Sequence, residues 1–144
     1  MTVIAWDGYT LAADKRATNG SLIRTTTKIF RIHSCLVGYS GEAAFGEQMI
    51  AWFQAGEKTE DFPKEQRDKD DWSPFLVIRE NGKIYKYERT PYPLKCQDKQ
   101  YAIGSGRDFA LAAMVCGKTA SEAVEIASMF DSNCGNGVDT LRIL

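Results

Sequence analysis

Hydrophobic and polar positions alternate with a period of two at the start of the chain, as in β-strands. Apolar runs over 3–6 and 9–13 flank Asp7-Gly8. This pattern predicts a β-hairpin with a type I′ turn, which needs positive φ at both central residues. A second hairpin is predicted to turn at Asn81-Gly82. Strands are predicted from the same spacing over 26–32, 35–38, 75–78, 83–87, 101–106 and 138–144.

Three segments change to the spacing of an amphipathic helix, with apolar residues three or four positions apart. The first is stopped by Gly56, and the second is closed by Gly117. The third starts at Thr119, with Glu122 three residues later, which predicts a capping box. The predicted inner faces are Phe45, Met49, Trp52 and Phe53; Phe109, Ala112, Ala113 and Cys116; and Ala123, Ile126, Ala127 and Phe130.

The segment 56–72 has alternating charges and no clear periodicity, so we expect a solvated loop there. Strand hairpins with helices grouped between them predict an α+β protein, in which helices are layered on antiparallel sheets. No linker, internal repeat or low-complexity segment interrupts residues 1–144. We therefore expect a single domain.

Composition excludes several function classes. The 19 acidic and 18 basic residues nearly balance, which gives no electrostatic reason to expect binding to nucleic acid or to an anionic membrane. No stretch approaches the roughly 18 apolar residues of a membrane span, and no signal-peptide pattern opens the chain. Four scattered cysteines and one histidine make a zinc site improbable. We expect a cytoplasmic protein with free thiols and no metal or cofactor.

Five segments in order resemble the proteasome β-subunit and HslV-type family of N-terminal nucleophile hydrolases. The most specific is L-A-A-D-K-R-A-T over 11–18, which follows a threonine at position 2. The others are K-I-F-R-I over 28–32, G-Y-S-G-E-A-A over 38–44, Y-A-I-G-S-G over 101–106, and D-S-N-C-G over 131–135. Together they cover nearly the whole chain.

This resemblance implies a four-layer αββα sandwich with an N-terminal threonine that attacks a peptide carbonyl. The chemistry suits the composition. A threonine hydroxyl needs a base, and a free α-amine, which titrates near pH 8, roughly, can accept its proton without a histidine. A neighbouring lysine favours the alkoxide, and an aspartate orients that lysine.

The resemblance also implies roles for individual residues. Thr2 would be nucleophile and base once Met1 is removed, with Lys28 beside it and Asp14 orienting Lys28. Gly41 would supply the oxyanion N–H, with Gly38 as the alternative donor. Ser105 and Asp131 would support the amine, and Tyr39 would face the substrate pocket together with Gly38. Cys134 stands where the family often has serine, and a thiol is the weaker hydrogen-bond partner.

Each of these residues also has a structural explanation: Thr2 as a strand residue, Lys28 as a solvated lysine, and Cys134 as a core residue. Three features depart from the family. The first hairpin is short, 56–72 replaces a second helix that takes part in ring contacts, and the amine is free only without Met1. The hairpin is shorter than in the family by an even number of residues. Because side chains of a strand alternate between its two faces, an even loss leaves Thr2 on the face where the family has its nucleophile, whereas an odd loss would place Met1 there.

Two hypotheses follow. The first is a threonine peptidase acting on peptides or unfolded proteins, in a homo-oligomer whose ring is altered, smaller or absent. Any ATP-dependent unfoldase would be a separate chain, because the sequence has no ATP-binding motif. The second is a non-catalytic proteasome-like fold that serves as a self-assembling or partner-binding module.

Overall fold

The computed structural model describes residues 2–68 and 73–144. Its helices are α1 (Ala43–Gln54), α2 (Lys64–Asp68), α3 (Arg107–Val115) and α4 (Ala120–Phe130), with a 3-10 turn at Thr59–Asp61. Its strands are β1 (Ile4–Trp6), β2 (Thr10–Asp14), β3 (Arg16–Asn19), β4 (Leu22–Thr25), β5 (Ile29–Ile32), β6 (Cys35–Tyr39), β7 (Phe75–Ile78), β8 (Ile84–Tyr87), β9 (Leu94–Cys96), β10 (Tyr101–Ile103) and β11 (Val138–Arg142).

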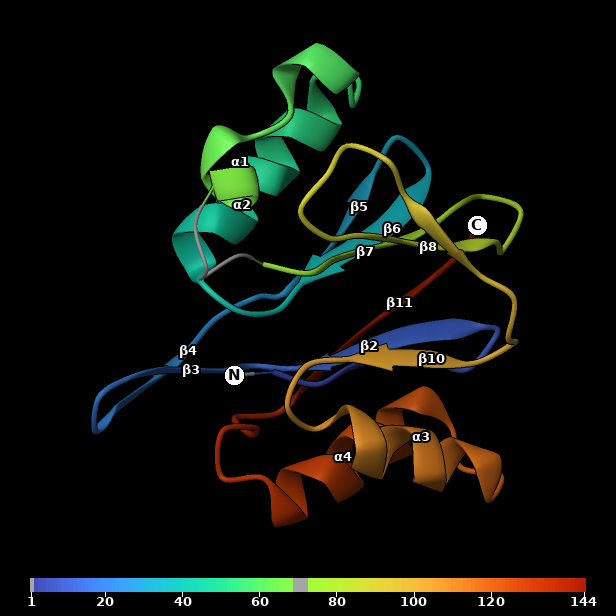
Figure 1. Ribbon diagram of the computed structural model, residues 1–144. Helices are drawn as coiled ribbons and strands as arrows, with labels where there is room; N and C mark the ends of the chain where they lie inside the picture. Colours follow the sequence, from blue (N-terminus) through green and yellow to red (C-terminus); the bar gives the residue numbers. More distant parts are fainter. Residues whose placement is uncertain (1, 69–72) are drawn as a thin grey trace.

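These elements form the expected four-layer αββα sandwich. Two antiparallel sheets are stacked, with strand orders β10-β1-β2-β11 and β5-β6-β7-β8-β9. Helices α1 and α2 lie outside the five-stranded sheet, and α3 and α4 lie outside the four-stranded sheet (Figure 1). Thr2, two residues before β1, is 5 % exposed and is therefore buried in the sandwich.

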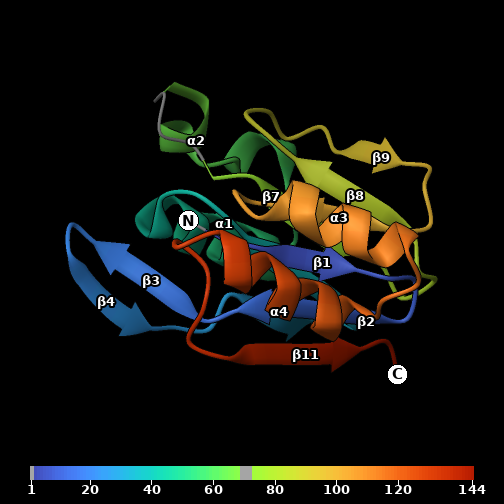
Figure 2. The same ribbon diagram turned by 90° about the horizontal axis from the view of Figure 1, so that it is seen from below.

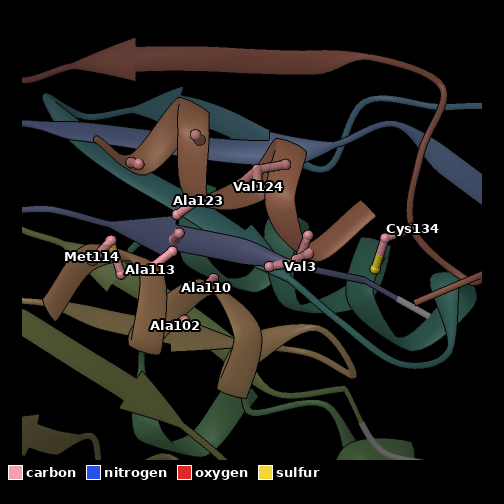
Figure 3. Close-up of a cluster of buried hydrophobic side chains, with 12 residues drawn as sticks. Val3, Ala102, Ala110, Ala113, Met114, Ala123, Val124 and Cys134 are labelled. Atoms are coloured by element: carbon pink, nitrogen blue, oxygen red, sulfur yellow. The ribbon is translucent and has the colours of Figure 1, made fainter. Parts of the chain in front are cut away.

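The hydrophobic core has one cluster for each layer boundary. Between the two sheets pack Ile4, Leu11, Leu36 and Leu76, all of them fully buried. An aromatic cluster lies between α1 and the five-stranded sheet, with Trp52 edge-on to both Phe62 and Tyr87. The third cluster, under α3 and α4, is built from small side chains such as Ala110, Ala123 and Val124 (Figure 3). Small residues bring these helices close to the sheet that carries Thr2.

The first hairpin is present, but its predicted turn type is wrong. β1 pairs with β2 in the register Ile4↔Ala13 to Trp6↔Leu11. Gly8 has a φ of +100°, whereas Asp7 is outside the positive-φ region that a type I′ turn requires. The Asp7 carboxylate instead accepts hydrogen bonds from the N–H groups of Tyr9 and Thr10, each at 2.8 Å. This acid builds the turn with its side chain.

The structure corrects the predicted inner faces of the two C-terminal helices. In α3 the buried residues are Ala110, Ala113 and Met114, and Phe109 is 43 % exposed. Of the predicted face only Ala113 is buried, because Ala112 and Cys116 are exposed as well. The buried face is turned by about one residue from the predicted one, toward Ala110 and Met114. In α4, Ala123 and Ala127 are buried as predicted, together with Ala120 and Val124. Phe130 is 67 % exposed.

A further hairpin, β3–β4, was not predicted, because its sequence has no alternation of apolar and polar residues. In the structure its two large apolar residues, Leu22 and Ile23, are exposed. It projects beyond the end of the four-stranded sheet (Figure 2). The segment 56–72 is also more ordered than the predicted solvated loop. It contains the 3-10 turn and α2, with Phe62 and Gln66 buried, although residues 69–72 lie outside the described part. The second outer helix is thus reduced to five residues.

The capping box at Thr119 gives a test of local stability. The Thr119 hydroxyl accepts from the Glu122 N–H, and the Glu122 carboxylate accepts from the Thr119 N–H at 3.0 Å. We expect Thr119→Ala to lower the free energy of unfolding by about 1 kcal/mol. Thr119→Ser, which keeps the oxygen, should lie within about 0.5 kcal/mol of the wild type. Urea unfolding followed by circular dichroism measures both, and equal losses in the two variants would contradict a role for the cap.

Candidate active site

Thr2 is held by the segment that follows β10. Its carbonyl oxygen accepts a hydrogen bond from the Gly106 N–H at 3.1 Å. Gly104 has a φ of +97°, and a Cβ added there would lie 2.0 Å from the Thr2 carbonyl oxygen. Only glycine allows this close approach. The G-S-G motif, to which the sequence analysis gave only the role of Ser105, therefore fixes the backbone of the proposed nucleophile.

The side chain of Thr2 lies against a buried ion pair. Lys28 Nζ is 3.2 Å from Thr2 Oγ1 and 2.9 Å from Asp14 Oδ1. The Lys28 side chain is only 6 % exposed, and that of Asp14 is completely buried. The ammonium group thus lies between the hydroxyl and the carboxylate, a position from which it could stabilise negative charge on Thr2 Oγ1.

Asp14 is the central acceptor of this arrangement. Its Oδ1 accepts from Lys28 and from the Val3 N–H at 3.0 Å, and its Oδ2 accepts from the N–H groups of Arg16 and Gly135, each at 3.1 Å. Four donors from four parts of the chain compensate the buried charge. The carboxylate therefore fixes Lys28 and also ties the 131–137 loop to the end of β2.

Ser105 and Asp131 are joined directly by a hydrogen bond. The Ser105 hydroxyl donates to Asp131 Oδ2 at 2.6 Å, and the Asn133 N–H donates to Oδ1 at 2.9 Å. Desolvation opposes ionisation of Asp131, but these hydrogen bonds outweigh it and lower the pKa of its carboxyl group. Asp131 thus stays an ionised hydrogen-bond acceptor at neutral pH.

Cys134 is buried beside this pair, and its thiol donates weakly to Asp131 Oδ2 at 3.5 Å. Burial, with the negative charges of Asp14 and Asp131, raises the pKa of the Cys134 thiol to about 12. Cys134 therefore remains a neutral thiol that packs against Val3 and Ala127.

A small pocket opens beside Thr2. It has a volume of about 190 Å³, and its lining includes Thr2, Lys28, Tyr39 and Gly41. Gly41 has a φ of +90° and lies in the turn between β6 and α1. A carbonyl group bound in this pocket would have the hydroxyl of Thr2 and the backbone of Gly41 among its neighbours.

The structure separates the two glycines that the sequence left as alternatives. Gly38 lies inside β6, where an added Cβ would come within 3.0 Å of Ile4 and Ile29. It is a packing residue between the sheets, and the pocket lining contains Gly41 instead. Tyr39 lines the pocket with part of its ring and donates its hydroxyl hydrogen to Glu47 Oε1 at 2.9 Å.

Arg16 is a structural residue of the site that sequence reasoning missed. Its guanidinium donates to the Ser132 carbonyl at 2.7 Å and to Asn136 Oδ1 at 3.1 Å. The Asn136 side chain in turn donates to the Arg24 carbonyl and to the Thr25 hydroxyl. These bonds join the β3–β4 hairpin to the 131–137 loop beside the pocket. Its position in the motif L-A-A-D-K-R-A-T, two residues after Asp14, was the sequence feature that could have pointed to it.

Two kinds of site were also sought in the described residues. Within 2–68 and 73–144, no group of three or more histidine, cysteine or acidic side chains is arranged to hold a metal ion. In the same part of the chain, no helix has the length and apolar character to cross a membrane.

The buried ion pair gives a clear stability test. We expect Asp14→Ala to cost about 3–5 kcal/mol, because a buried ammonium and three N–H groups lose their acceptor. The matched control is the surface pair Lys15–Asp139, at 2.7 Å, where Asp139→Ala should cost no more than about 1 kcal/mol. Chemical denaturation of both variants makes the comparison. Similar losses would show that Asp14 does not organise the site.

The raised pKa of Cys134 predicts its reactivity. At pH 8.5 its thiol should remain protonated and react slowly with iodoacetamide, whereas the exposed Cys116 should be alkylated first. Peptide mass spectrometry of briefly labelled native protein measures the two sites separately. Alkylation of Cys134 at the rate of Cys116, without unfolding, would be incompatible with this geometry.

Comparison with known proteins agrees with the fold. No family model matches the sequence, and no curated protein sequence matches it. Among solved structures, Thiobacillus denitrificans BPH in complex with epoxomicin is similar, with a TM-score of 0.77 and 18 % identity over the whole of both chains. A second BPH structure gives 0.72 and 19 % over 100 % of this chain and 99 % of that one. Eukaryotic HslV from Trypanosoma brucei gives 0.69 and 20 % over 97 % of each chain. The chain has the fold of these HslV and proteasome-type proteins.

Proposed function

We propose that this protein is an N-terminal threonine peptidase of the proteasome and HslV type, active after removal of Met1. One observation carries the proposal: Lys28 Nζ lies 3.2 Å from Thr2 Oγ1 while paired with the buried Asp14. A lysine near a threonine is common. Burial of its ammonium group costs free energy, however, and a buried, paired charge beside a hydroxyl in a pocket is typical of a functional site.

The proposed mechanism uses four groups of this chain. The free α-amine of Thr2 takes the proton from Oγ1, and Oγ1 attacks the carbonyl carbon of a peptide in the pocket. Lys28 stabilises the developing alkoxide, and the Gly41 N–H donates to the oxyanion. The amine returns its proton to the leaving nitrogen, which leaves an ester on Thr2. Water, deprotonated by the same amine, hydrolyses this ester and restores the hydroxyl.

Ser105 and Asp131 have a supporting role in this scheme. The ionised Asp131, held by the Ser105 hydroxyl at 2.6 Å, favours the protonated amine that forms during attack. Cys134 contributes packing and a weak donor rather than a base, since its pKa of about 12 keeps it neutral. Tyr39, with its hydroxyl committed to Glu47, is proposed to form one wall of the pocket for the side chain that precedes the cleaved bond.

The non-catalytic alternative has less support. A partner-binding module would not need an ammonium buried against Thr2 Oγ1 or a pocket in front of that hydroxyl. We expect the substrate to be a peptide or unfolded protein segment and the protein to be a homo-oligomer. A separate ATP-dependent unfoldase and a cytoplasmic location remain predictions from the sequence.

The test is covalent labelling of Thr2. Epoxomicin, which one of the similar BPH structures contains, or a β-lactone should add to chains that have lost Met1. Chains that keep Met1 should remain unmodified, because their Thr2 nitrogen is in a peptide bond. Intact-mass spectrometry reads the N-terminus and the adduct together.

Two variants complete this test. Thr2→Ala should abolish the adduct, whereas Thr140→Ala, a change at an exposed threonine of β11, should leave it intact. A Met1-free wild-type chain that forms no adduct and cleaves no unfolded protein would refute the proposed function. A chain from its native host that always retains Met1 would refute it as well.

A further inference from the structure

The charged segment after α1 contains a completely buried polar side chain, Gln66. It lies on α2, a helix of five residues that is too short to be stable by itself. Its Nε2 donates to the Ser73 carbonyl and, at 2.9 Å, to the Glu88 carbonyl. Its Oε1 accepts from the Ser73 N–H at 2.9 Å. The amide thus binds both backbone groups of Ser73, as a neighbouring strand would.

No other side-chain type of this size can make all three bonds. A carboxylate would have no donor for the two carbonyl groups, and a methionine would have neither donor nor acceptor. Burial of an amide costs free energy that only its hydrogen bonds compensate. A glutamine is therefore required at position 66 by the backbone groups that it binds, which include those of Ser73, just before β7.

Ser73 and its neighbour Pro74 connect this clamp to the proposed active site. The Ser73 hydroxyl, itself buried, donates to the Glu42 carbonyl at 2.6 Å. The Pro74 carbonyl accepts from the Ser40 N–H at 3.1 Å. Both ends of the turn 40–42 are thus bound by two consecutive residues. Gly41, in the middle of this turn, lines the pocket beside Thr2.

We infer that Gln66 is a positioning residue for the oxyanion site: through Ser73 and Pro74 it fixes the turn that carries the Gly41 N–H. This inference rests on the proposed function for its catalytic meaning, but the mechanical coupling stands on the hydrogen bonds alone. Gln66 is not among the residues that line the pocket.

The coupling predicts which kinetic constant changes. An oxyanion donor acts on charge that develops only in the transition state, so a displaced donor lowers kcat more than it raises KM. A displacement of about 1 Å is enough for a large loss, up to about 100-fold. The short helix α2 would thus influence kcat through the side-chain amide of Gln66.

The decisive experiment compares two variants of the full-length, Met1-free protein. Gln66→Met keeps the length of the side chain and removes all three bonds. Ser73→Ala removes only the hydroxyl bond to Glu42 and keeps the Gln66 clamp. The matched controls are Gln54→Met, at an exposed position of α1, and Ser128→Ala, which removes a hydroxyl bond to the Val124 carbonyl in α4.

Amide hydrogen exchange followed by NMR tests the coupling without any activity. The reporters are the N–H groups of Ser40 and Gly46, which donate to Pro74 and Glu42 on either side of Gly41. Gln66→Met should speed exchange at both reporters by about 10-fold or more relative to Val37 in the centre of β6. Equal acceleration at Val37 would mean general destabilisation and would overturn the inference. Unchanged reporters would do the same.

Peptide hydrolysis tests the catalytic meaning. Gln66→Met and Ser73→Ala should each lower kcat by about 10-fold or more with KM within about 3-fold of the wild type, and both controls should match the wild type. Should Gln66→Met fail to fold, Gln66→Glu takes its place in the same two measurements, because it keeps the acceptor for the Ser73 N–H and loses both donor bonds. Accelerated exchange at Ser40 and Gly46 together with an unchanged kcat would overturn the positioning role. An inactive wild type would instead refute the proposed function, and the exchange result would still decide the coupling.

Discussion

The arrangement around Thr2 depends on one interaction, the burial of the Asp14 carboxylate among four donors. An isolated buried charge would be expensive, so the fold must bring Lys28, Val3, Arg16 and Gly135 to the same two oxygen atoms. Val3 and Lys28 directly precede β1 and β5, Arg16 begins β3, and Gly135 lies in the 131–137 loop. A carboxylate at the end of one strand thus sets the relative positions of both sheets and of the loop that carries Asp131.

The inner layers could be predicted from the sequence because their patterns are short and local. Asp7-Gly8 and Asn81-Gly82 mark hairpins, and Thr119 with Glu122 marks the start of α4. Of the stripe predicted for α1, Met49, Trp52 and Phe53 are buried, since large side chains fill the space above the five-stranded sheet, and Phe45 is half-buried. For α3 the same reasoning failed. There Ala110, Ala113 and Met114 face the sheet, and Phe109, the largest apolar residue of the predicted face, lies on the surface.

The site itself was predictable only in part. The resemblance of the ordered motifs to a known family indicated Thr2, Asp14 and Lys28, and in the structure their side chains lie together. The choice between Gly38 and Gly41 could not be made from spacing. It depends on which glycine faces Ile4 across the sheets. Gln66 gave no signal at all, since a glutamine in a charged segment resembles a solvated residue until its burial is known.

The anchoring of Thr2 has a consequence for how this chain would be switched on. Gly106 binds the carbonyl side of Thr2, and Gly104 leaves room for that carbonyl alone. Nothing in this anchor involves the nitrogen of Thr2. Loss of the preceding residue would therefore create a charged group at a point in space that is already fixed. Under the proposed function, activation would then be the release of one nitrogen atom on a backbone that Gly104 and Gly106 already hold in place.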